Sequence, residues 1–326
     1  MNILDLLAQN LLSPAILFFG LGILAGFVKS DLEVPESISR YLSIYLMMAI
    51  GFKGGVAIAN TPDFNSEVLG TIFAGLVIGL AQPFLGYGLL RLTTKIDKAT
   101  AAAVAAHYGS ISMVTFVTAT AFLKTGDVVY AGYIVAVLAL MEAPAILSGL
   151  FIAHRGDPKT RHVAQEKKLV REIFTNGAIL LLSGAFLIGW ITGQPGMDKV
   201  EAFLVTPFHG VLCLFLLDMG LLVARNAHHL RSFSPALIVF GVYMPLIGAA
   251  AGLVSSYVIG LDVGTGTLFT VLCASASYIA VPAAMRLALP EAKAAIYLPM
   301  SLAITFPFNV GIGIPLYYAA SSMLLS

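Results

Sequence analysis

The sequence predicts an all-α polytopic membrane protein with ten transmembrane helices in two inverted five-helix repeats, in which helices 4 and 9 are broken. Three observations support this fold class: the composition, the number of apolar segments, and similar stretches at matched places in the two halves. Of the 326 residues, 59% are hydrophobic and 11% are charged, and the mean hydropathy is +0.92. Soluble domains carry about 25% charged residues, so this composition indicates a chain that lies mostly in lipid.

The apolar segments set the helix count. A spanning helix needs about 20 mostly apolar residues, and ten segments approach that length. They are roughly 12–28, 38–52, 66–90, 99–123, 128–153, 175–193, 202–224, 233–260, 264–289 and 293–320. The second is the weakest, because the tetrapeptide FKGG at 52–55 interrupts it. The charged segment 154–173 separates a first repeat at 1–153 from a second repeat at 174–326.

The repeat rests on three pairs of similar stretches. They are AHYGSISMVTF (106–116) with CASASYIAVPAAMR (273–286), 14–27 with 177–190, and 52–60 with 218–226. Their offsets are 165, 163 and 166 residues, and the first places Ser110 on Ser275 and Ser112 on Ser277. An odd number of helices in each half inverts the second half relative to the first, as in many secondary transporters.

The basic residues predict the orientation in the membrane. Loops and helix ends on one side hold 15 of the 18 lysines and arginines, and the other side holds only Lys53, Lys124 and Lys199. Because cytoplasmic loops are enriched in Lys and Arg, we expect 154–173 in the cytoplasm and both termini outside. A bacterial inner (plasma) membrane is the expected location.

The two serine stretches are the expected substrate site. Serine competes for backbone hydrogen bonds, and the interior Pro282 removes one, so both segments should break. A broken helix exposes N–H groups that suit an anion and carbonyl groups that suit a cation. The candidate substrate-binding residues are Ser110, Ser112, Thr115, Ser275, Ser277 and Tyr278. The alternative interpretation is that small residues simply let membrane helices pack closely.

Glu142 is the main candidate for coupling to a cation. It lies near the middle of the fifth segment, where a carboxylate costs about 2.5–3.5 kcal/mol to insert, so intramembrane acids are usually functional. Two further residues are expected near the coupling cation: Gly109, which tolerates unusual φ angles, and Asn309. No cofactor is expected, with Na+ or a proton as the coupling ion. Glu142 as a neutral, hydrogen-bonded core acid is the alternative.

Other classes of function lack sequence support. Hydrolase, zinc-protease, P-loop and dinucleotide motifs do not occur in a suitable context, so we expect no enzyme. Both cysteines, Cys213 and Cys273, lie in apolar segments and are read as core residues, with no metal site. A net charge of +1 argues against a nucleic-acid surface.

The chain resembles the cyanobacterial-type sodium-dependent bicarbonate transporters over essentially its whole length. The landmarks are GSIS (109–112) followed by Thr115, MEAPA (141–145), 273–286 with its trailing Arg286, LALP ending at Pro290, and IPLY (314–317). The resemblance implies core and gate subdomains, a homotrimer, a PII-like regulatory partner, and cotransport of bicarbonate with Na+. It also implies that Ser110, Ser112, Thr115, Ser275 and Ser277 contact the anion.

The chain departs from that family in two places. Tyr278 stands where the family pattern has an aspartate, and Met113 and Val114 replace small glycine and serine residues. Glu142, by contrast, keeps an acidic residue where the family usually has Asp. The loss of the aspartate at Tyr278 predicts weaker dependence on Na+, or dependence on protons instead.

Two other functions remain open from the sequence. A carboxylate or organic-anion symporter of the bile-acid-transporter type shares the plan of five plus five helices. A non-transporting anion sensor would signal through 154–173, but that segment is only about 20 residues long.

Overall fold

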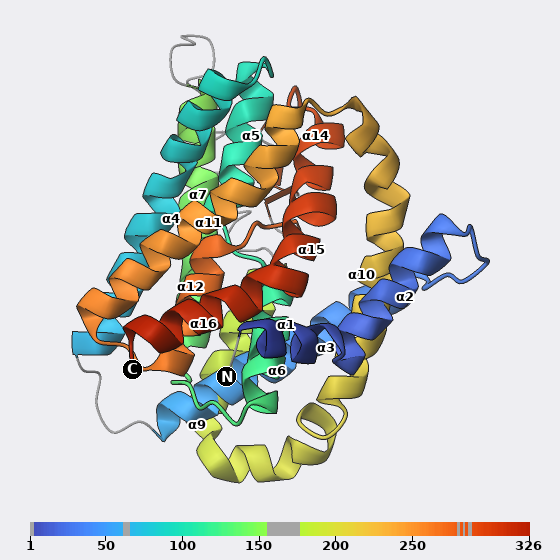
Figure 1. Ribbon diagram of the computed structural model, residues 1–326. Coiled ribbons are helices and arrows are strands. Elements are labelled where there is room, and N and C mark those ends of the chain that lie inside the picture. The colour runs from blue at the N-terminus through green and yellow to red at the C-terminus, as the bar shows by residue number, and fades with distance from the viewer. Residues whose placement is uncertain (1–2, 61–65, 155–176, 279–280, 283, 286–288) are drawn as a thin grey trace.

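The computed structural model describes residues 3–60, 66–154, 177–278, 281–282, 284–285 and 289–326 (Figure 1). These described residues contain helices and no strand. Eight helical stretches are long and apolar enough to cross a membrane, with 98–125 and 294–324 each counted as one stretch, and two shorter apolar helices accompany them. The expected loop 154–173 and Arg286 lie outside the described residues, apart from His154 at the end of a helix.

Four helices pack as two crossed pairs (Figure 1). They are α2 (Pro14–Phe27), α3 (Glu36–Ala59), α9 (Gly177–Leu204) and α10 (Phe208–Asn226). Helix α2 packs on α10, and α3 packs on α9. Residues 177–190 of α9 resemble 14–27 of α2, and residues 218–226 of α10 resemble 52–60 at the end of α3. Helix α2 therefore packs on the helix that resembles α3, and α3 packs on the helix that resembles α2.

Glycines bring these helices together. A Cβ at Gly22 of α2 would lie 2.1 Å from the Leu217 carbonyl oxygen, and one at Gly220 would lie 2.2 Å from that of Phe19. A Cβ at Gly55 of α3 would lie 1.9 Å from the Phe186 carbonyl oxygen. Small residues allow such close backbone contact in membranes. The expectation that FKGG interrupts the helix is therefore wrong: α3 continues to Ala59.

A second group contains the remaining helices. They are α4 (Ser66–Thr93), α5 (Lys98–Gly109), α6 (Met113–Thr125), α7 (Ile134–His154), α11 (Pro235–Ile259), α12 (Val263–Ala274) and a C-terminal run. That run comprises α14 (Ala294–Pro299), η3 (Met300–Thr305), α15 (Phe306–Phe308), η4 (Asn309–Gly313) and α16 (Ile314–Leu324), of which η3 and η4 are π-helical. Helix α4 packs on α5 and α7, and α11 packs on α12.

Two short elements complete the described chain. Helix α1 (Ile3–Leu11) is tied to the π-helical η4, because Asn10 Nδ2 donates to the carbonyl oxygens of Val310 (2.8 Å) and Gly311 (3.2 Å). The 3-10 helix η2 (Ala227–Ser232) follows α10.

Several expected boundaries shift in the structure. Helix α9 turns at Gly193 (φ 57°, ψ −155°) and then continues to Leu204, so the segment expected from 202 begins at Phe208 instead. A positive φ of this kind favours glycine. Helix α7 begins at Ile134 rather than near 128.

Helices α5 and α12 have matching ends. The Asp97 side chain accepts a hydrogen bond from the Thr100 N–H, and Asp262 accepts one from Thr265. Their C-caps are Ser110 and Ser275. Each of these positions differs by 165 residues from its counterpart, so the two helices begin and end in register.

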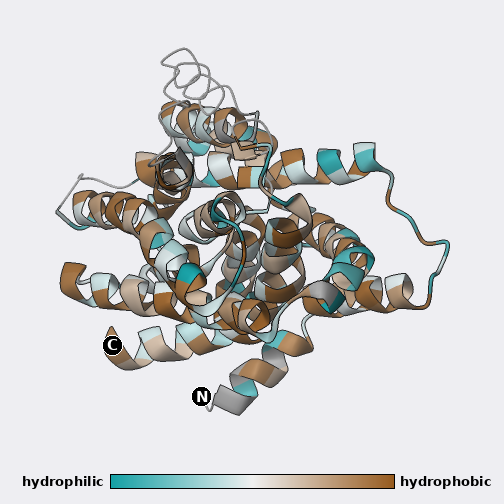
Figure 2. Ribbon diagram, turned by 90° about the horizontal axis from the view of Figure 1, so that it is seen from above, coloured by the Kyte–Doolittle hydropathy of each residue, from teal (hydrophilic) through white to brown (hydrophobic). Residues whose placement is uncertain are grey.

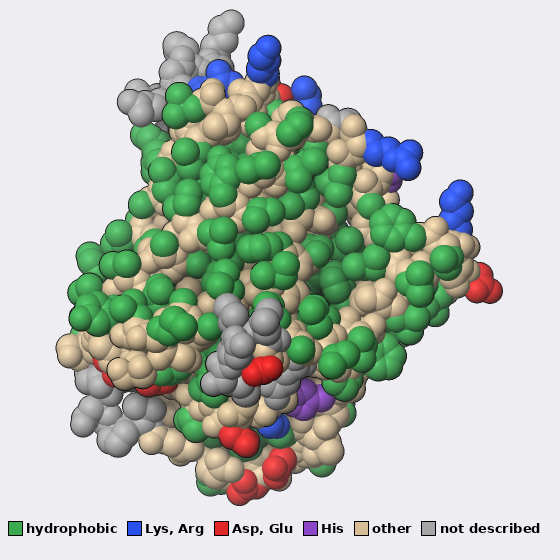
Figure 3. Space-filling model, in the orientation of Figure 1, with side chains coloured by type: hydrophobic (Ala, Val, Ile, Leu, Met, Phe, Trp, Pro, Cys, Tyr) green, Lys and Arg blue, Asp and Glu red, His purple; other side chains and the backbone are tan. Residues whose placement is uncertain are grey.

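The surface separates by polarity. Large apolar side chains are exposed on the outer helices, among them Phe73 on α4, Ile191 on α9 and Val258 on α11, as expected for contact with lipid. Hydrophobic residues occur along the length of most helices (Figure 2). Basic side chains gather at one end of the molecule, and most acidic side chains in view lie at the other (Figure 3). Asp97 and Lys293 form an ion pair of 3.3 Å.

Candidate functional site

Both serine stretches depart from helical geometry. Helix α5 ends at Gly109, Ser110 (φ −98°, ψ 167°) and Ser112 (φ −109°, ψ 110°) are extended, and α6 begins at Met113. Helix α12 ends at Ala274, and Ser275 is extended (φ −88°, ψ 168°). Of the continuation after Tyr278, residues 279–280, 283 and 286–288 lie outside the described part.

The two extended segments meet, and each donates a backbone N–H to the other. The Ser112 N–H donates to the Ser275 Oγ at 2.8 Å, and the Ser277 N–H donates to the His107 carbonyl oxygen at 2.9 Å. All four residues are buried. The structure thus brings Ser112, Ser275 and Ser277 together from opposite halves of the chain. We call this meeting point, residues 107–112 with 272–278, the crossing.

The crossing is not symmetric, and Ser110 marks the difference. Ser275 Oγ accepts from the Ser112 N–H and donates to the Leu272 carbonyl oxygen at 2.9 Å. The equivalent Ser110 hydroxyl is 1% exposed and has no hydrogen-bond partner among the described residues. A buried polar group left unpaired costs about 1–3 kcal/mol. Because buried polar groups usually have a hydrogen-bond partner, this hydroxyl is a candidate ligand-binding group.

Ser112 and Thr115 form the N-cap of α6. The Ser112 Oγ accepts hydrogen bonds from the Thr115 N–H (3.2 Å) and the Thr115 Oγ1 (2.9 Å). The Tyr278 hydroxyl lies close to Ser112 and has no hydrogen-bond partner in the part of the chain that the structure describes. Its ring packs edge-on against Phe306, with centroids 5.4 Å apart. Helix α6 therefore begins at the crossing, with its N-cap two residues after Ser110.

Gln82 on α4 joins the carbonyl ends of the two half-helices. Its Nε2 donates to the Tyr108 carbonyl oxygen at 2.6 Å and to that of Cys273 at 3.0 Å. Sequence reasoning missed this residue. The available signal was an amide in the interior of a 28-residue apolar helix, next to Pro83, since buried polar residues in membranes usually have a specific partner.

Asn309 acts in a similar way on the second half-helix. Its Nδ2 donates to the Ala274 carbonyl oxygen at 2.9 Å, and its Oδ1 accepts from the Tyr317 hydroxyl at 2.8 Å. The side chain thus holds the end of α12 in place. Its oxygen keeps one further lone pair toward the helix end.

Gly109 is required for space rather than for its φ angle. Among the described glycines, only Gly193 and Gly260 have positive φ, so the expectation of an unusual φ at Gly109 is wrong. A Cβ at Gly109 would lie 2.4 Å from Pro83 Cγ and 3.2 Å from Ala145 Cβ. Any side chain there would push α4 and α7 away from the break.

Glu142 lies on α7 at the level of the crossing. Ala145 packs against Gly109, and one turn further along α7 Gly149 packs against Ala106, so α5 and α7 run in opposite directions. Residues three and seven positions apart share a helix face, and Glu142 lies one turn before Ala145. The buried carboxyl group, 5% exposed, is therefore level with Ser110–Ser112.

The described residues contain no group of three or more His, Cys, Asp or Glu that would hold a metal ion. Neither Cys213 nor Cys273 forms a disulfide. Oxygen ligands for Na+ at the crossing would come from carbonyl and hydroxyl groups, which hard cations prefer.

Many apolar helices and two interrupted ones that meet inside the protein define a multi-pass membrane protein. The chain belongs to the Na+-dependent bicarbonate transporter superfamily, whose family model matches residues 14–322. This match confirms the resemblance found in the sequence. No curated protein matches the chain.

Proposed function

We propose that this protein is a secondary active transporter that imports bicarbonate by symport with Na+. The observation that carries this proposal is the buried Ser110 hydroxyl, which has no partner among the described residues and lies beside the N-terminus of α6. Helix N-termini and hydroxyl donors suit a small oxyanion. Membership of a Na+-dependent bicarbonate transporter family supports bicarbonate as the substrate and Na+ as the coupling ion.

The proposed roles divide the crossing into two sides. The anion binds Ser110, Ser112, Thr115, Ser275 and Ser277, with Tyr278 as a further donor. The cation binds near the carbonyl ends of α5 and α12, with Glu142 supplying negative charge and Gly109 and Asn309 nearby. Because Tyr278 replaces a family aspartate, a proton is the alternative coupling ion.

The same proposal includes two inverted five-helix repeats, split at 154–173. It is supported by the matched caps of α5 and α12 and by the crossed pairs α2–α10 and α3–α9. The basic end of the molecule faces the cytoplasm by the positive-inside rule, which leaves both termini outside the plasma membrane. The homotrimer and the PII-like partner stay predictions from the resemblance.

Uptake into proteoliposomes tests the function. The purified protein should accumulate radiolabelled bicarbonate when Na+ is high outside, and should not do so when K+ replaces Na+. Accumulation driven by a proton gradient alone would assign proton coupling. Uptake of an organic carboxylate without bicarbonate would favour the bile-acid-transporter type, and a folded protein that transports neither would favour a sensor.

A further inference from the structure

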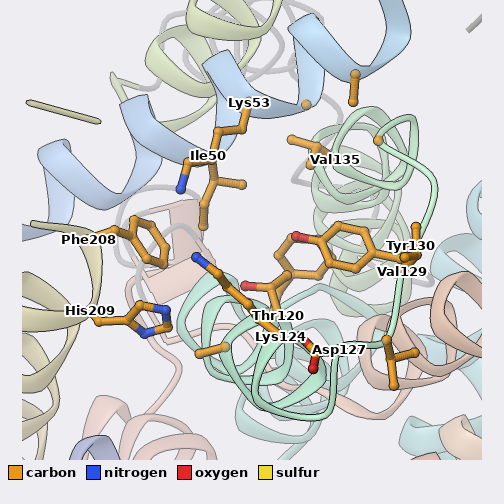
Figure 4. Close-up of a pocket in the computed structure, with 16 residues that line it drawn as sticks. Ile50, Lys53, Thr120, Lys124, Asp127, Val129, Tyr130, Val135, Phe208 and His209 are labelled. Atoms are coloured by element: carbon orange, nitrogen blue, oxygen red, sulfur yellow. The ribbon is translucent and has the colours of Figure 1, made fainter. Parts of the chain in front are cut away.

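A second polar region lies at the far end of α6 from the crossing. A cavity of about 450 Å3 is bounded by α3, α6, the start of α10 and the segment 126–132 (Figure 4). Phe116 and Thr120 of α6 line it, one and two turns beyond Ser112, and Lys124 lines it near the end of the helix. The cavity therefore leads from the end of the molecule toward the crossing along one face of α6.

Positive charge dominates this cavity. Lys53, Lys124 and His209 line it, and Asp127 is the one carboxylate among its described lining residues. Neither lysine forms an ion pair with any carboxylate that the structure describes. Figure 4 shows both ammonium groups directed to the side formed by Phe208 and His209, with Asp127 lying away from them. Lys53, Lys124 and His209 come from three different helices and lie around the same part of the cavity (Figure 4).

Lys53 is the informative member of the set. It lies inside the 24-residue helix α3, between the close-packed glycines that contact α9 and α7. Its Nζ lies 4.3 Å from the centroid of the Phe208 ring, a cation–π contact that partly offsets its loss of water. A charged residue kept in a spanning helix without a carboxylate partner is a candidate for a substrate pathway.

We propose that this cavity is an anion vestibule, in which Lys53 and Lys124 concentrate a small hydrated oxyanion before it reaches the crossing. This inference rests on the proposed function, since it names where the transported anion enters. A cleft lined by one sign of charge raises the local concentration of counter-ions, by factors of about 10 to 1,000. Lysine ammonium groups act here as point charges, without the fixed geometry that arginine would impose.

The first test measures anion enrichment without transport. A fluorophore attached at Val129→Cys, an exposed position on the cavity lining, is quenched with iodide and, separately, with neutral acrylamide. At low salt, we expect Lys53→Gln with Lys124→Gln to lower the iodide-to-acrylamide quenching ratio about three- to tenfold. Screening should shrink the difference as the ionic strength rises. Lys53→Arg with Lys124→Arg should keep the ratio.

Lys199→Gln is the matched control. It removes the third lysine expected on the same side of the membrane, and this exposed residue of α9 does not line the cavity. Its quenching ratio should equal that of the unmodified protein. If the double Gln variant of Lys53 and Lys124 has the same quenching ratio as the unmodified protein, the proposal of an anion vestibule is wrong.

Uptake kinetics provide the second test. The double Gln variant should raise the KM for bicarbonate about three- to tenfold at low salt and leave kcat within about twofold, because the charges act before the anion reaches the crossing. If the unmodified protein carries no bicarbonate but the quenching ratio falls as expected, the proposed function fails and the vestibule stands. If the unmodified protein takes up bicarbonate and the KM does not change in the double Gln variant, the vestibule proposal is wrong and the proposed function stands.

Discussion

Gln82 is expected to hold the two half-helices at the crossing. Its amide nitrogen has two hydrogens, and both are used, on the carbonyl oxygens of Tyr108 and Cys273. These carbonyls belong to the last turns of α5 and α12, where no N–H group of the same helix follows to donate to them. The Gln82→Met variant keeps the length of the side chain and removes both donors.

The expected loss follows from the number of bonds. Hydrogen bonds between membrane helices contribute about 0.6 kcal/mol on average and up to about 1.7 kcal/mol. Two such bonds therefore predict a fall of about 1–3 kcal/mol in the free energy of unfolding. Uptake should fall as well, since the ends of both half-helices lose their common support.

Chemical unfolding in mixed micelles and uptake in proteoliposomes measure the two effects. Gln194→Met is the control, because Gln194 also donates from its Nε2, to Asp198 Oδ1 at 2.8 Å, but on an exposed part of α9. That variant should change stability by less than about 0.5 kcal/mol. Equal stability and uptake in Gln82→Met and the unmodified protein would refute the role given to Gln82.

Three further predictions follow from other residues. Glu142→Gln should abolish gradient-driven uptake while the protein still inserts and folds. If this variant takes up substrate as the unmodified protein does, Glu142 does not couple transport to the cation. Tyr278→Asp should steepen the dependence of uptake on Na+ at fixed pH, and an unmodified protein that already requires Na+ at low concentration would contradict this. Burial alone would raise the pKa of Asp97, but hydrogen bonds from Thr100 and the charge of Lys293 outweigh it and lower that pKa below 3.8. Asp97→Ala should therefore cost about 1 kcal/mol at neutral pH, a difference that shrinks as the pH falls below about 4 and that unfolding at several pH values would measure.

The sequence predicted the features that depend on local chemistry. Serine next to glycine inside an apolar segment indicated the break after Gly109, and the offset of 165 residues paired Ser110 with Ser275. The N-caps at Asp97 and Asp262 were not predicted, although they obey the same offset. The break and both caps are decided by residues within a few positions of one another.

The missed features depend on contacts between distant parts of the chain. Gln82 bonds to residues 26 and 191 positions away, which no local pattern indicates. The glycines at 54–55 looked like an interruption, but they are the contact surface of α3. Gly109 was assigned a conformational role, whereas its neighbour Pro83 on another helix explains the glycine. The roles proposed at Ser110, Glu142 and Tyr278 stay predictions.

The central claim, that the crossing binds the transported anion, is tested most directly by comparing two buried serines. Ser148 of α7 is 4% exposed and donates to the Leu80 carbonyl oxygen at 2.8 Å, whereas Ser110 is 1% exposed and has no partner among the described residues. A hydrogen bond to a charged ligand contributes about 1.5–3 kcal/mol, which corresponds to about a ten- to hundredfold change in affinity.

The measurement is the KM of bicarbonate uptake, together with thermal stability, for Ser110→Ala and Ser148→Ala. The account predicts that Ser110→Ala raises KM about ten- to a hundredfold without loss of stability, because its hydroxyl has no partner to lose within the described protein. Ser148→Ala should lose some stability and keep its KM. An unchanged KM in Ser110→Ala would contradict the claim that the anion binds at the crossing.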